Sequence, residues 1–288
     1  MTALPKKILV TGSTGFIGRR LLPRLLSLGH TALELEKGLD IRERASYERL
    51  KGKGVDTVVH LAGLTFVPES WKEPDKFYSV NALGTQQALE FCRENSCRMI
   101  YVSGYVYGIP EYLPIDEAHP VKPNNPYAHS KWLGEEVCRF YSEHMGVKAM
   151  VLRPFNLYGP GQGESFLIPM LIKQAREGRE IVVKDDTPKR DYLHVDDFIE
   201  ACALAVSSNE RFCVYNVGSG ESMSVREIVE AVIEAGGSRI KWKTLDEKRP
   251  NEIPDTVADC GALRDALGWS PKKGFKESIK ELLFLKNG

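Results

Sequence analysis

Three glycines, each separated from the next by two residues, follow an apolar run close to the N-terminus. Residues 8–10 (Ile-Leu-Val) form that run, and a continuous apolar segment is typical of a strand buried on both faces. After Gly12, Gly15 and Gly18, apolar residues recur at helical spacing, interrupted by Pro23, which is expected to kink the helix or remove a hydrogen bond. At such a strand-to-helix turn, backbone N–H groups can approach a pyrophosphate. The pattern predicts a dinucleotide site; the alternative is a purely structural turn.

An acidic residue, Glu36, ends the second predicted strand, which begins at residue 31. In dinucleotide folds a carboxylate about 20 residues beyond the glycine turn accepts hydrogen bonds from the adenosine ribose. The alternative is a solvated loop carboxylate. Asp40 and Ile41 follow, within reach of an adenine edge. Three basic residues lie nearby in the sequence, namely Lys37, Arg42 and Arg44. The segment therefore favours NAD, while the basic residues leave a cofactor with a 2′-phosphate open.

Two more predicted strands end in small or polar residues. Residues 55–61 lead into Ala62 and Gly63, which permit close approach of a cofactor, and residues 98–103 end in Ser103. Ligands in doubly wound sheets bind outside the carboxyl ends of the strands. Ser103 is therefore expected beside the same crevice as the glycine turn.

A Pro-rich polar loop at residues 108–125, typical of an active-site rim, precedes a helix that opens at residue 126. Tyr127 and Lys131 are four residues apart on that helix, so their side chains share one face. A buried ammonium beside a phenol is expected to lower the pKa of the phenol and make it an acid/base near neutral pH. The alternative is an ordinary exposed pair. Together with Ser103 and the glycine turn, in this order, the pair predicts a catalytic group.

The second half of the chain is less regular. The remaining predicted elements are helix 75–94, strand 148–152, helix 166–177, strand 180–184, strand then helix 191–206, strand 214–218, helix 224–235, strand 240–243 and two closing helices. Residues 153–161 are dense in Gly and Pro and are expected to leave the sheet as a loop. The predicted class is α/β, a Rossmann-type doubly wound parallel sheet with a smaller, interleaved C-terminal α/β substrate domain. The predicted boundaries are 1–160 for the nucleotide domain, with 190–217 returning to it, and 161–189 and 218–288 for the substrate domain.

Composition disfavours several classes of function. Lys plus Arg and Asp plus Glu both number 39, so the chain shows no basic excess for nucleic acid. No apolar segment reaches membrane-spanning length and no signal peptide is expected, which predicts a cytoplasmic protein without membrane contacts. The six cysteines are scattered without CxxC pairs, so free buried thiols are expected. His60 is interpreted as a core histidine and Asp196-Asp197 as the first turn of a helix, so no metal site is predicted.

Eight segments between residues 11 and 252 carry a further resemblance: TGSTGFIG, HLAG, YVSGYVYG, PYAHSK, RPFNLYGPGQ, KRDYLHVDD, NVGSG and RPNE. In these segments, which span nearly the whole chain, the sequence resembles an extended short-chain dehydrogenase/reductase of the nucleotide-sugar epimerase/dehydratase type. The resemblance implies an NAD-dependent enzyme that acts on a nucleotide-diphosphate sugar, usually as a homodimer.

The resemblance also implies roles for individual residues. Catalytic roles are implied for Ser103, Tyr127 and Lys131. A dinucleotide site is implied at Gly12, Gly15, Phe16, Ile17, Gly18, Glu36, Asp40, Ile41, Leu61, Ala62, Gly63 and Asn81, with Tyr127 and Lys131. Contacts to the sugar nucleotide are implied for Ser103, Asn156, Arg190 and Arg249.

The same resemblance bears on which reaction is catalysed. In the family's 4,6-dehydratases an Asp-Glu pair follows the catalytic Ser/Thr; here Gly104 and Tyr105 stand there, which disfavours a dehydratase. Glu36 and Leu64 favour a UDP-hexose 4-epimerase, which forms a transient 4-keto sugar. The short chain and the segment 249–252, in place of Arg-Pro-Gly-Asp, favour the alternative, a nucleotide-sugar 4-ketoreductase that consumes NAD(P)H. A remote alternative is a non-catalytic dinucleotide-sensing protein, but such proteins typically lose the Tyr or the Lys.

Overall fold

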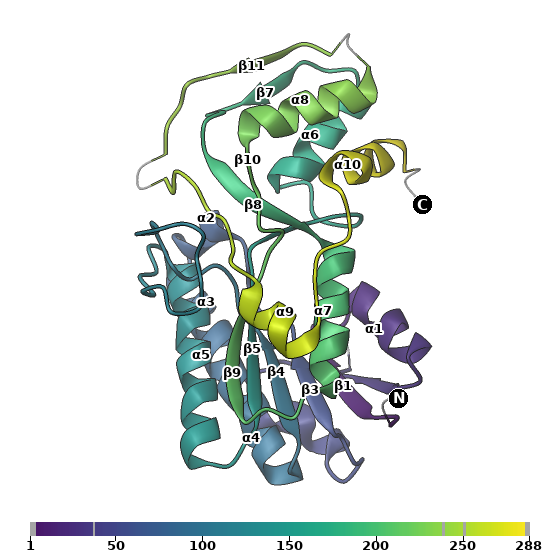
Figure 1. Cartoon of the computed structure of the whole chain (residues 1–288). Helices are drawn as coiled ribbons and strands as arrows, with labels where there is room; N and C mark the ends of the chain where they lie inside the picture. The colour runs from purple at the N-terminus through teal and green to yellow at the C-terminus, as the bar shows by residue number, and fades with distance from the viewer. Residues whose placement is uncertain (1–3, 37, 238–239, 250–251, 286–288) are drawn as a thin grey trace.

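A six-stranded parallel sheet forms the centre of the larger lobe (Figure 1). The computed structural model describes residues 4–36, 38–237, 240–249 and 252–285. The strands are β1 (Lys7–Thr11), β2 (Thr31–Glu34), β3 (Thr57–His60), β4 (Arg98–Val102), β5 (Ala149–Pro154) and β9 (Phe212–Val217). Their order is β2-β1-β3-β4-β5-β9, with every neighbouring pair parallel. Because the order reverses between β1 and β3, the carboxyl ends of those two strands bound a crevice.

Both faces of this sheet are covered by helices. They are α1 (Gly18–Ser27), α4 (Gly84–Asn95), α5 (Pro126–His144), α7 (Val195–Ser207), α9 (Gly261–Leu267) and the 3-10 helix η1 (Arg44–Leu50). Ile8 and Val10 of β1 pack with α1, α7 and α9, whereas Leu9 packs on the other face with η1, α4 and α5. The predicted doubly wound sheet is confirmed. Helix α1 stays continuous across Pro23, which therefore removes one hydrogen bond without ending the helix.

The helix predicted at residues 75–94 is interrupted. It consists of α3 (Pro74–Tyr78), a π-helical turn η2 (Ser79–Leu83) and then α4, with the short helix α2 (Val67–Ser70) before it. Asn81 lies in this π turn, and its buried side chain bonds to the loop after β3 rather than within the helix. Single π turns are frequent at functional sites, but a pattern of period 3.6 does not predict them.

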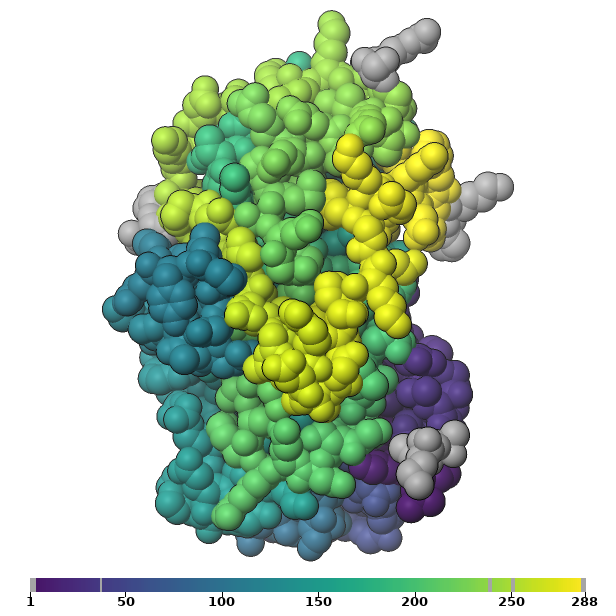
Figure 2. Space-filling view, viewed as in Figure 1, coloured from purple at the N-terminus to yellow at the C-terminus, as the bar shows by residue number. Residues whose placement is uncertain are grey.

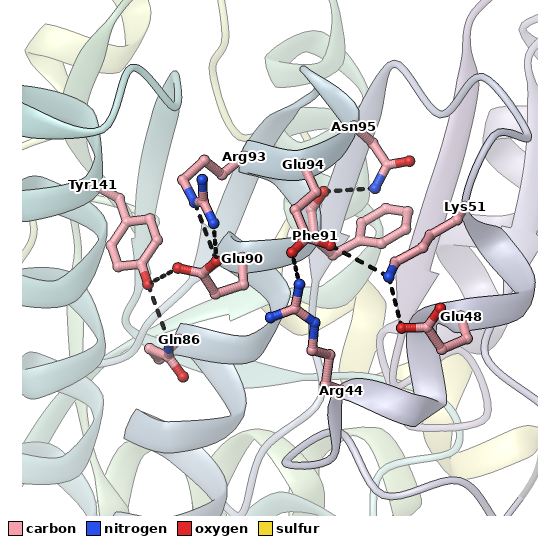
Figure 3. Close-up of polar contacts among 10 residues, drawn as sticks. All are labelled: Arg44, Glu48, Lys51, Gln86, Glu90, Phe91, Arg93, Glu94, Asn95 and Tyr141. Carbon is pink, nitrogen blue, oxygen red and sulfur yellow. Dashed lines mark hydrogen bonds and ion pairs between the residues drawn. The ribbon is translucent and has the colours of Figure 1, made fainter.

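Polar contacts tie α4 to η1 and α5 (Figure 3). Glu90 accepts a hydrogen bond from the hydroxyl of Tyr141 on α5, at 2.5 Å. Glu94 pairs with Arg44 of η1 and with Lys51, which follows η1. Exposed ion pairs typically contribute about 0–1 kcal/mol each, so the apolar residues of α4 under the sheet contribute more to its stability.

A smaller lobe lies beyond the carboxyl ends of the central strands (Figure 1). Its elements are β6 (Asn156–Tyr158), β7 (Ile181–Val183), β8 (Lys189–His194), β10 (Ser222–Ser224), β11 (Trp242–Thr244), α6 (Leu167–Arg176), α8 (Val225–Gly236) and α10 (Phe275–Phe284). The strands form one sheet in the order β10-β8-β6 and one parallel pair, β11 with β7. The helices enclose a separate apolar core. The loop expected at 153–161 was wrong in part, because β6 pairs with β8 there and Gly/Pro density conceals so short a strand.

The C-terminal segment connects the two lobes. Helix α9 packs against β9 and α7 of the larger lobe, whereas α10 packs against α6 and α8 of the smaller one. Between them, the indole nitrogen of Trp269 donates to the carbonyl oxygen of Asp197 at 2.9 Å. In the space-filling view this segment, coloured yellow, lies over both lobes (Figure 2).

Several local predictions are confirmed. Asp196 and Asp197 lie in the first turn of α7, where carboxylates favour the helix dipole. The helix predicted at 224–235 is α8, and it begins with a capping box in which Ser224 and Glu227 bond to each other's backbone. All six cysteines are free, and five of them are buried. Among the helices that the structure describes, none is long and apolar enough to cross a membrane.

His60 is a core histidine, as predicted. It is fully buried at the end of β3, and its Nδ1 lies 2.8 Å from the hydroxyl of Thr11. Its Nε2 has no hydrogen-bond partner among the described residues. Burial, aided by the charge of Lys131, lowers the pKa of His60 to about 3. The imidazole is therefore neutral in the folded protein at any pH above about 4.

We expect His60 to make the protein less stable in acid. A histidine in the unfolded chain has a pKa of about 6.5 and the native one about 3, so the unfolded state binds one more proton between these values. The stability that follows from this difference in pKa is fully present above about pH 6.5, and the free energy of unfolding is lower by about 2 kcal/mol at pH 5. Chemical unfolding of wild type and His60→Asn at about pH 7.5 and pH 5 measures it. The variant should lose clearly less stability on acidification, whereas His144→Asn, at an exposed histidine, should behave like wild type. Equal losses in all three proteins would exclude His60 as the cause.

Candidate active site

The glycine turn lies at the crevice between β1 and β3. Gly12 has φ +70°, in the left-handed region that favours glycine, and a Cβ there would lie 2.7 Å from the backbone nitrogen of Ala62. A Cβ on Gly18 would lie 2.4 Å from the carbonyl oxygen of Gly12. A side chain at Gly12 or Gly18 would therefore clash with the backbone of this turn. The two glycines fit a dinucleotide that is held by backbone N–H groups at the start of α1. The remaining predicted residues here are Gly15 in the turn, and Phe16, Ile17 and Leu61, which are partly buried against the core.

The acidic residues predicted to hold the adenosine are paired with arginines. Glu36, two residues beyond the end of β2, accepts two hydrogen bonds from Arg49 of η1, at 2.6 and 2.8 Å. Asp40 is paired in the same way with Arg42. Ile41 packs against the first residue of α4, where a Cβ on Gly84 would lie 2.6 Å from its Cδ1. The pairing of Glu36 with Arg49 was not predicted, and Lys37 lies outside the described residues.

The three predicted catalytic residues come from two neighbouring elements. Ser103 directly follows β4 and is buried, whereas Tyr127 and Lys131 lie on one face of α5. The hydroxyl of Tyr127 lies against Gly104, where a Cβ would be only 2.4 Å away. The ammonium of Lys131 lies over the ring of Tyr101, 4.3 Å from its centre. The phenol therefore stands beside the residue that follows Ser103, at the carboxyl end of the sheet.

The pKa values differ from the sequence-based expectation. Burial lowers the pKa of Lys131 to about 8. Burial also raises the pKa of Tyr127 to about 12, so the expected lowering by the neighbouring ammonium was wrong for the protein without ligands. The cause is desolvation of the buried phenolate, which the ammonium of Lys131 does not offset. A further positive charge near the phenol would favour its ionised form, and an oxidised nicotinamide ring supplies one when bound.

Asn81 connects the loop after β3 to the catalytic helix. Its side-chain oxygen accepts from the backbone nitrogen of Leu64 at 2.8 Å, and its nitrogen donates to the Leu64 carbonyl at 3.0 Å. The same nitrogen lies 2.9 Å from the hydroxyl of Ser130 on α5. A Cβ on Gly63 would lie 2.8 Å from Asn81 and 3.7 Å from the ammonium of Lys131. The predicted residues Gly63, Asn81 and Lys131 thus meet in one place.

Apart from Ser103, the predicted substrate residues lie on the smaller lobe and its connections. Arg190 on β8 donates to the carbonyl oxygen of Ile253 at 2.6 Å and forms an ion pair with Glu252. The exposed Arg249 lies 4.0 Å from the same carboxylate. Asn156 on β6 donates to a backbone oxygen of β8 at 3.2 Å. Two arginines therefore face one acidic group, while residues 250 and 251 between them are outside the described part of the chain.

A buried ion pair behind Ser103 was not predicted. The hydroxyl of Ser103 donates to the carboxylate of Glu135, which is paired with Arg153. Glu135 stands four residues after Lys131, so helical spacing could have placed it on the catalytic face. No local pattern relates it to Arg153 on β5, because that contact arises only from the packing of α5 on the sheet.

Comparison with known proteins shows the family to which the chain belongs. The model of the NAD-dependent epimerase/dehydratase family matches residues 8–218. The GDP-6-deoxy-D-mannose reductase of Pseudomonas aeruginosa is 32% identical over 97% of this chain and 97% of its own. A structure of RMD from Pseudomonas aeruginosa complexed with NADPH superposes with a TM-score of 0.90, at 32% identity over 96% of this chain and 97% of that one.

A second solved structure is an epimerase. The UDP-glucose 4-epimerase of Thermus thermophilus in complex with NAD superposes with a TM-score of 0.86, at 32% identity over 96% of this chain and 97% of that one. The fold agrees with these two structures along nearly the full length of the chain. The chain belongs to the NAD-dependent epimerase/dehydratase family.

Proposed function

We propose that this protein is an NAD-dependent nucleotide-sugar epimerase of the UDP-hexose 4-epimerase type, which acts through a transient 4-keto sugar. The observation that carries the proposal is the position of the Tyr127 hydroxyl, beside Gly104 and at the strand end that bears Ser103. A group that can take a proton from a sugar hydroxyl thus stands next to the dinucleotide cradle. Gly104 and Tyr105 provide no carboxylic acid for the elimination of water, which disfavours a dehydratase.

Each catalytic residue has a separate role in this proposal. NAD, when bound, supplies a hydride acceptor that returns the hydride in the second half of the reaction. Tyr127 accepts the proton of the sugar 4-hydroxyl and later returns it to the oxygen of the 4-keto group, while inversion requires that the hydride come back to the opposite face of C4. Lys131 favours the ionised phenol and binds the nicotinamide ribose, and Ser103 hydrogen-bonds the reacting oxygen. The chain thereby returns every proton that it takes, and no reductant is consumed.

The cofactor and the sugar nucleotide are assigned to different lobes. The cofactor would lie on the residues implied by the family resemblance, from the glycine turn to Glu36, Asp40 and Ile41, with Asn81 holding the loop beside it. The sugar diphosphate would bind Arg190 and Arg249, because forked charged donors suit phosphate oxygens. Glu252 would have to give up its pairing with Arg190 when substrate binds. The domain boundaries stay a proposal, 1–160 with 190–217 for the nucleotide domain and 161–189 with 218–288 for the substrate domain; β6 and β8 in the smaller lobe and α9 on the larger lobe depart from this division. The free cysteines suit a reducing cytoplasm.

Glu36 should determine the choice between NAD and NADP. A carboxylate that accepts from both ribose hydroxyls repels a 2′-phosphate, so wild type should bind NAD(H) more tightly than NADP(H). Glu36→Ala releases Arg49 from its ion pair and should shift the ratio of affinities toward NADP(H) by about 10- to 100-fold. Titration of both cofactors measures this ratio. Glu48→Ala, which removes another exposed carboxylate of η1, is the control. Tighter NADPH binding by wild type would overturn this assignment.

We also propose a homodimer formed through α4 and α5. Phe140 on α5 is 52% exposed, and Tyr141 beside it holds α4 through Glu90 (Figure 3). Wild type should therefore have twice the mass of the 32.3 kDa chain in light scattering. Phe140→Asp should shift the protein toward the monomer, because a charge would be buried in an apolar contact. Phe284→Asp, at an exposed phenylalanine of the smaller lobe, should leave the mass unchanged. A monomeric wild type would rule out the dimer.

The second candidate is a nucleotide-sugar 4-ketoreductase. The likeness to RMD complexed with NADPH favours it specifically. Incubation with UDP-glucose, UDP-galactose and their N-acetyl forms, with catalytic NAD and no reductant, distinguishes the two. The epimerase interconverts a pair of C4 epimers, which chromatography separates. A reductase leaves these sugars unchanged and reduces a 4-keto-6-deoxy nucleotide sugar with one NAD(P)H consumed per product.

A further inference from the structure

The hydroxyl of Ser103 is engaged inside the protein. Its Oγ donates to Oε1 of Glu135 at 2.5 Å, and the two residues are 4% and 1% exposed. Glu135 lies one helical turn beyond Lys131 on α5, so it reaches Ser103 from the catalytic helix. A hydroxyl has one proton to donate, and here that proton points to the carboxylate.

Glu135 is itself held rigidly. Arg153 on β5 donates to both carboxylate oxygens, from Nε at 3.1 Å to each and from Nη2 to Oε2 at 2.6 Å. The other end of this guanidinium donates to the hydroxyl of Tyr107 at 2.8 Å, which in turn donates to Asn216 at 2.6 Å. Burial lowers the pKa of Arg153, but Glu135 and Tyr107 together raise it by more, so the guanidinium stays charged.

The network bears directly on the hydroxyl that would meet the sugar. We propose that Glu135, held by Arg153, is a positioning residue that fixes the rotamer and the proton of Ser103. Held in this way, the Oγ of Ser103 has one fixed position from which to hydrogen-bond the reacting oxygen. Without this constraint the small side chain would rotate among staggered conformers, and the reacting oxygen would lose a fixed partner. The kinetic part of this inference rests on the proposed function, but the positioning of Ser103 does not.

Glu135→Asp is the most informative substitution. It keeps the negative charge that acts on Arg153 and Lys131, but its shorter side chain no longer extends to Ser103. Its crystal structure should show Ser103 in more than one rotamer, whereas wild type and Glu136→Gln should show one. Glu136 is the matched control, since it neighbours Glu135 but makes a partly exposed pair with Arg139. A single, unchanged Ser103 rotamer in Glu135→Asp would overturn the proposal, whatever the protein's substrate is.

The kinetic arm uses whichever nucleotide sugar wild type converts. Glu135→Asp and Glu135→Gln should lower kcat by about 10- to 100-fold with little change in KM, because geometry at the reacting atom is lost and binding is not. In a Ser103→Ala background the same substitutions should change kcat by less than about 2-fold, because no hydroxyl remains to be positioned. Equal losses in both backgrounds would mean that Glu135 acts on the fold or on Lys131 instead. A wild type inactive on every nucleotide sugar would count against the proposed function, and the rotamers would still decide the positioning.

Discussion

Tyr127→Phe is expected to abolish most of the activity, by about 10²- to 10⁴-fold in kcat, while NAD affinity and melting temperature stay close to those of wild type. The phenol hydroxyl is the group that exchanges a proton with the sugar in the proposed reaction. Its loss should leave the packing nearly intact, because the ring stays on α5 and only the oxygen beside Gly104 disappears.

Steady-state kinetics on the identified nucleotide sugar, together with an NAD titration, measures this effect. Tyr47→Phe is the control, since Tyr47 is a buried tyrosine of η1 that packs in the core on the α4 face. It should keep wild-type turnover. A Tyr127→Phe enzyme with wild-type turnover would remove this phenol from the mechanism.

Gly12→Ala is expected to abolish dinucleotide binding and to lower stability more than an ordinary glycine substitution. Two effects add: the left-handed backbone costs about 1–2 kcal/mol for any other residue, and the new Cβ would lie 2.7 Å from a backbone nitrogen that cannot easily move. The loop after β3 would be displaced, and with it Ala62 and Gly63, which line the proposed cofactor site.

Gly29→Ala isolates the first effect. Gly29 has φ +83° but no atom within 4 Å of a built Cβ, so only the backbone cost applies there. Calorimetric unfolding and NAD titration of both variants give the comparison. Gly12→Ala should bind NAD at least about 100-fold more weakly and melt lower than Gly29→Ala, which should bind like wild type. Similar behaviour of the two would mean that the close approach at Gly12 does not matter.

The glycine turn and the Tyr–Lys pair could be predicted because each of them has a local pattern in the sequence. A buried strand that meets spaced glycines, and a Tyr and a Lys one helical turn apart, are readable from neighbouring residues. The central sheet therefore agrees with what the segments predicted, whereas the roles of Gly63, Asn81 and Lys131 follow from the family resemblance and stay predictions.

What the sequence did not predict depends on packing between distant segments. Arg49 of η1 pairs with Glu36, which follows β2. Arg153 meets Glu135 only because α5 packs on β5. The pKa of Tyr127 was expected to fall because the nearby ammonium is visible in the sequence, whereas the burial of the phenol is not. Burial is a property of the whole fold, so a motif alone cannot give it.

The central claim is that the sugar is oxidised and reduced again within one turnover. Its most direct test is incubation of the purified protein with UDP-galactose deuterated at C4, with catalytic NAD and no reductant, followed by mass spectrometry of the products. The account predicts UDP-glucose that keeps the deuterium at C4, with no net change in NADH absorbance. Failure to convert any UDP-hexose, with reduction of a 4-keto-6-deoxy nucleotide sugar at one NAD(P)H per product, would contradict it.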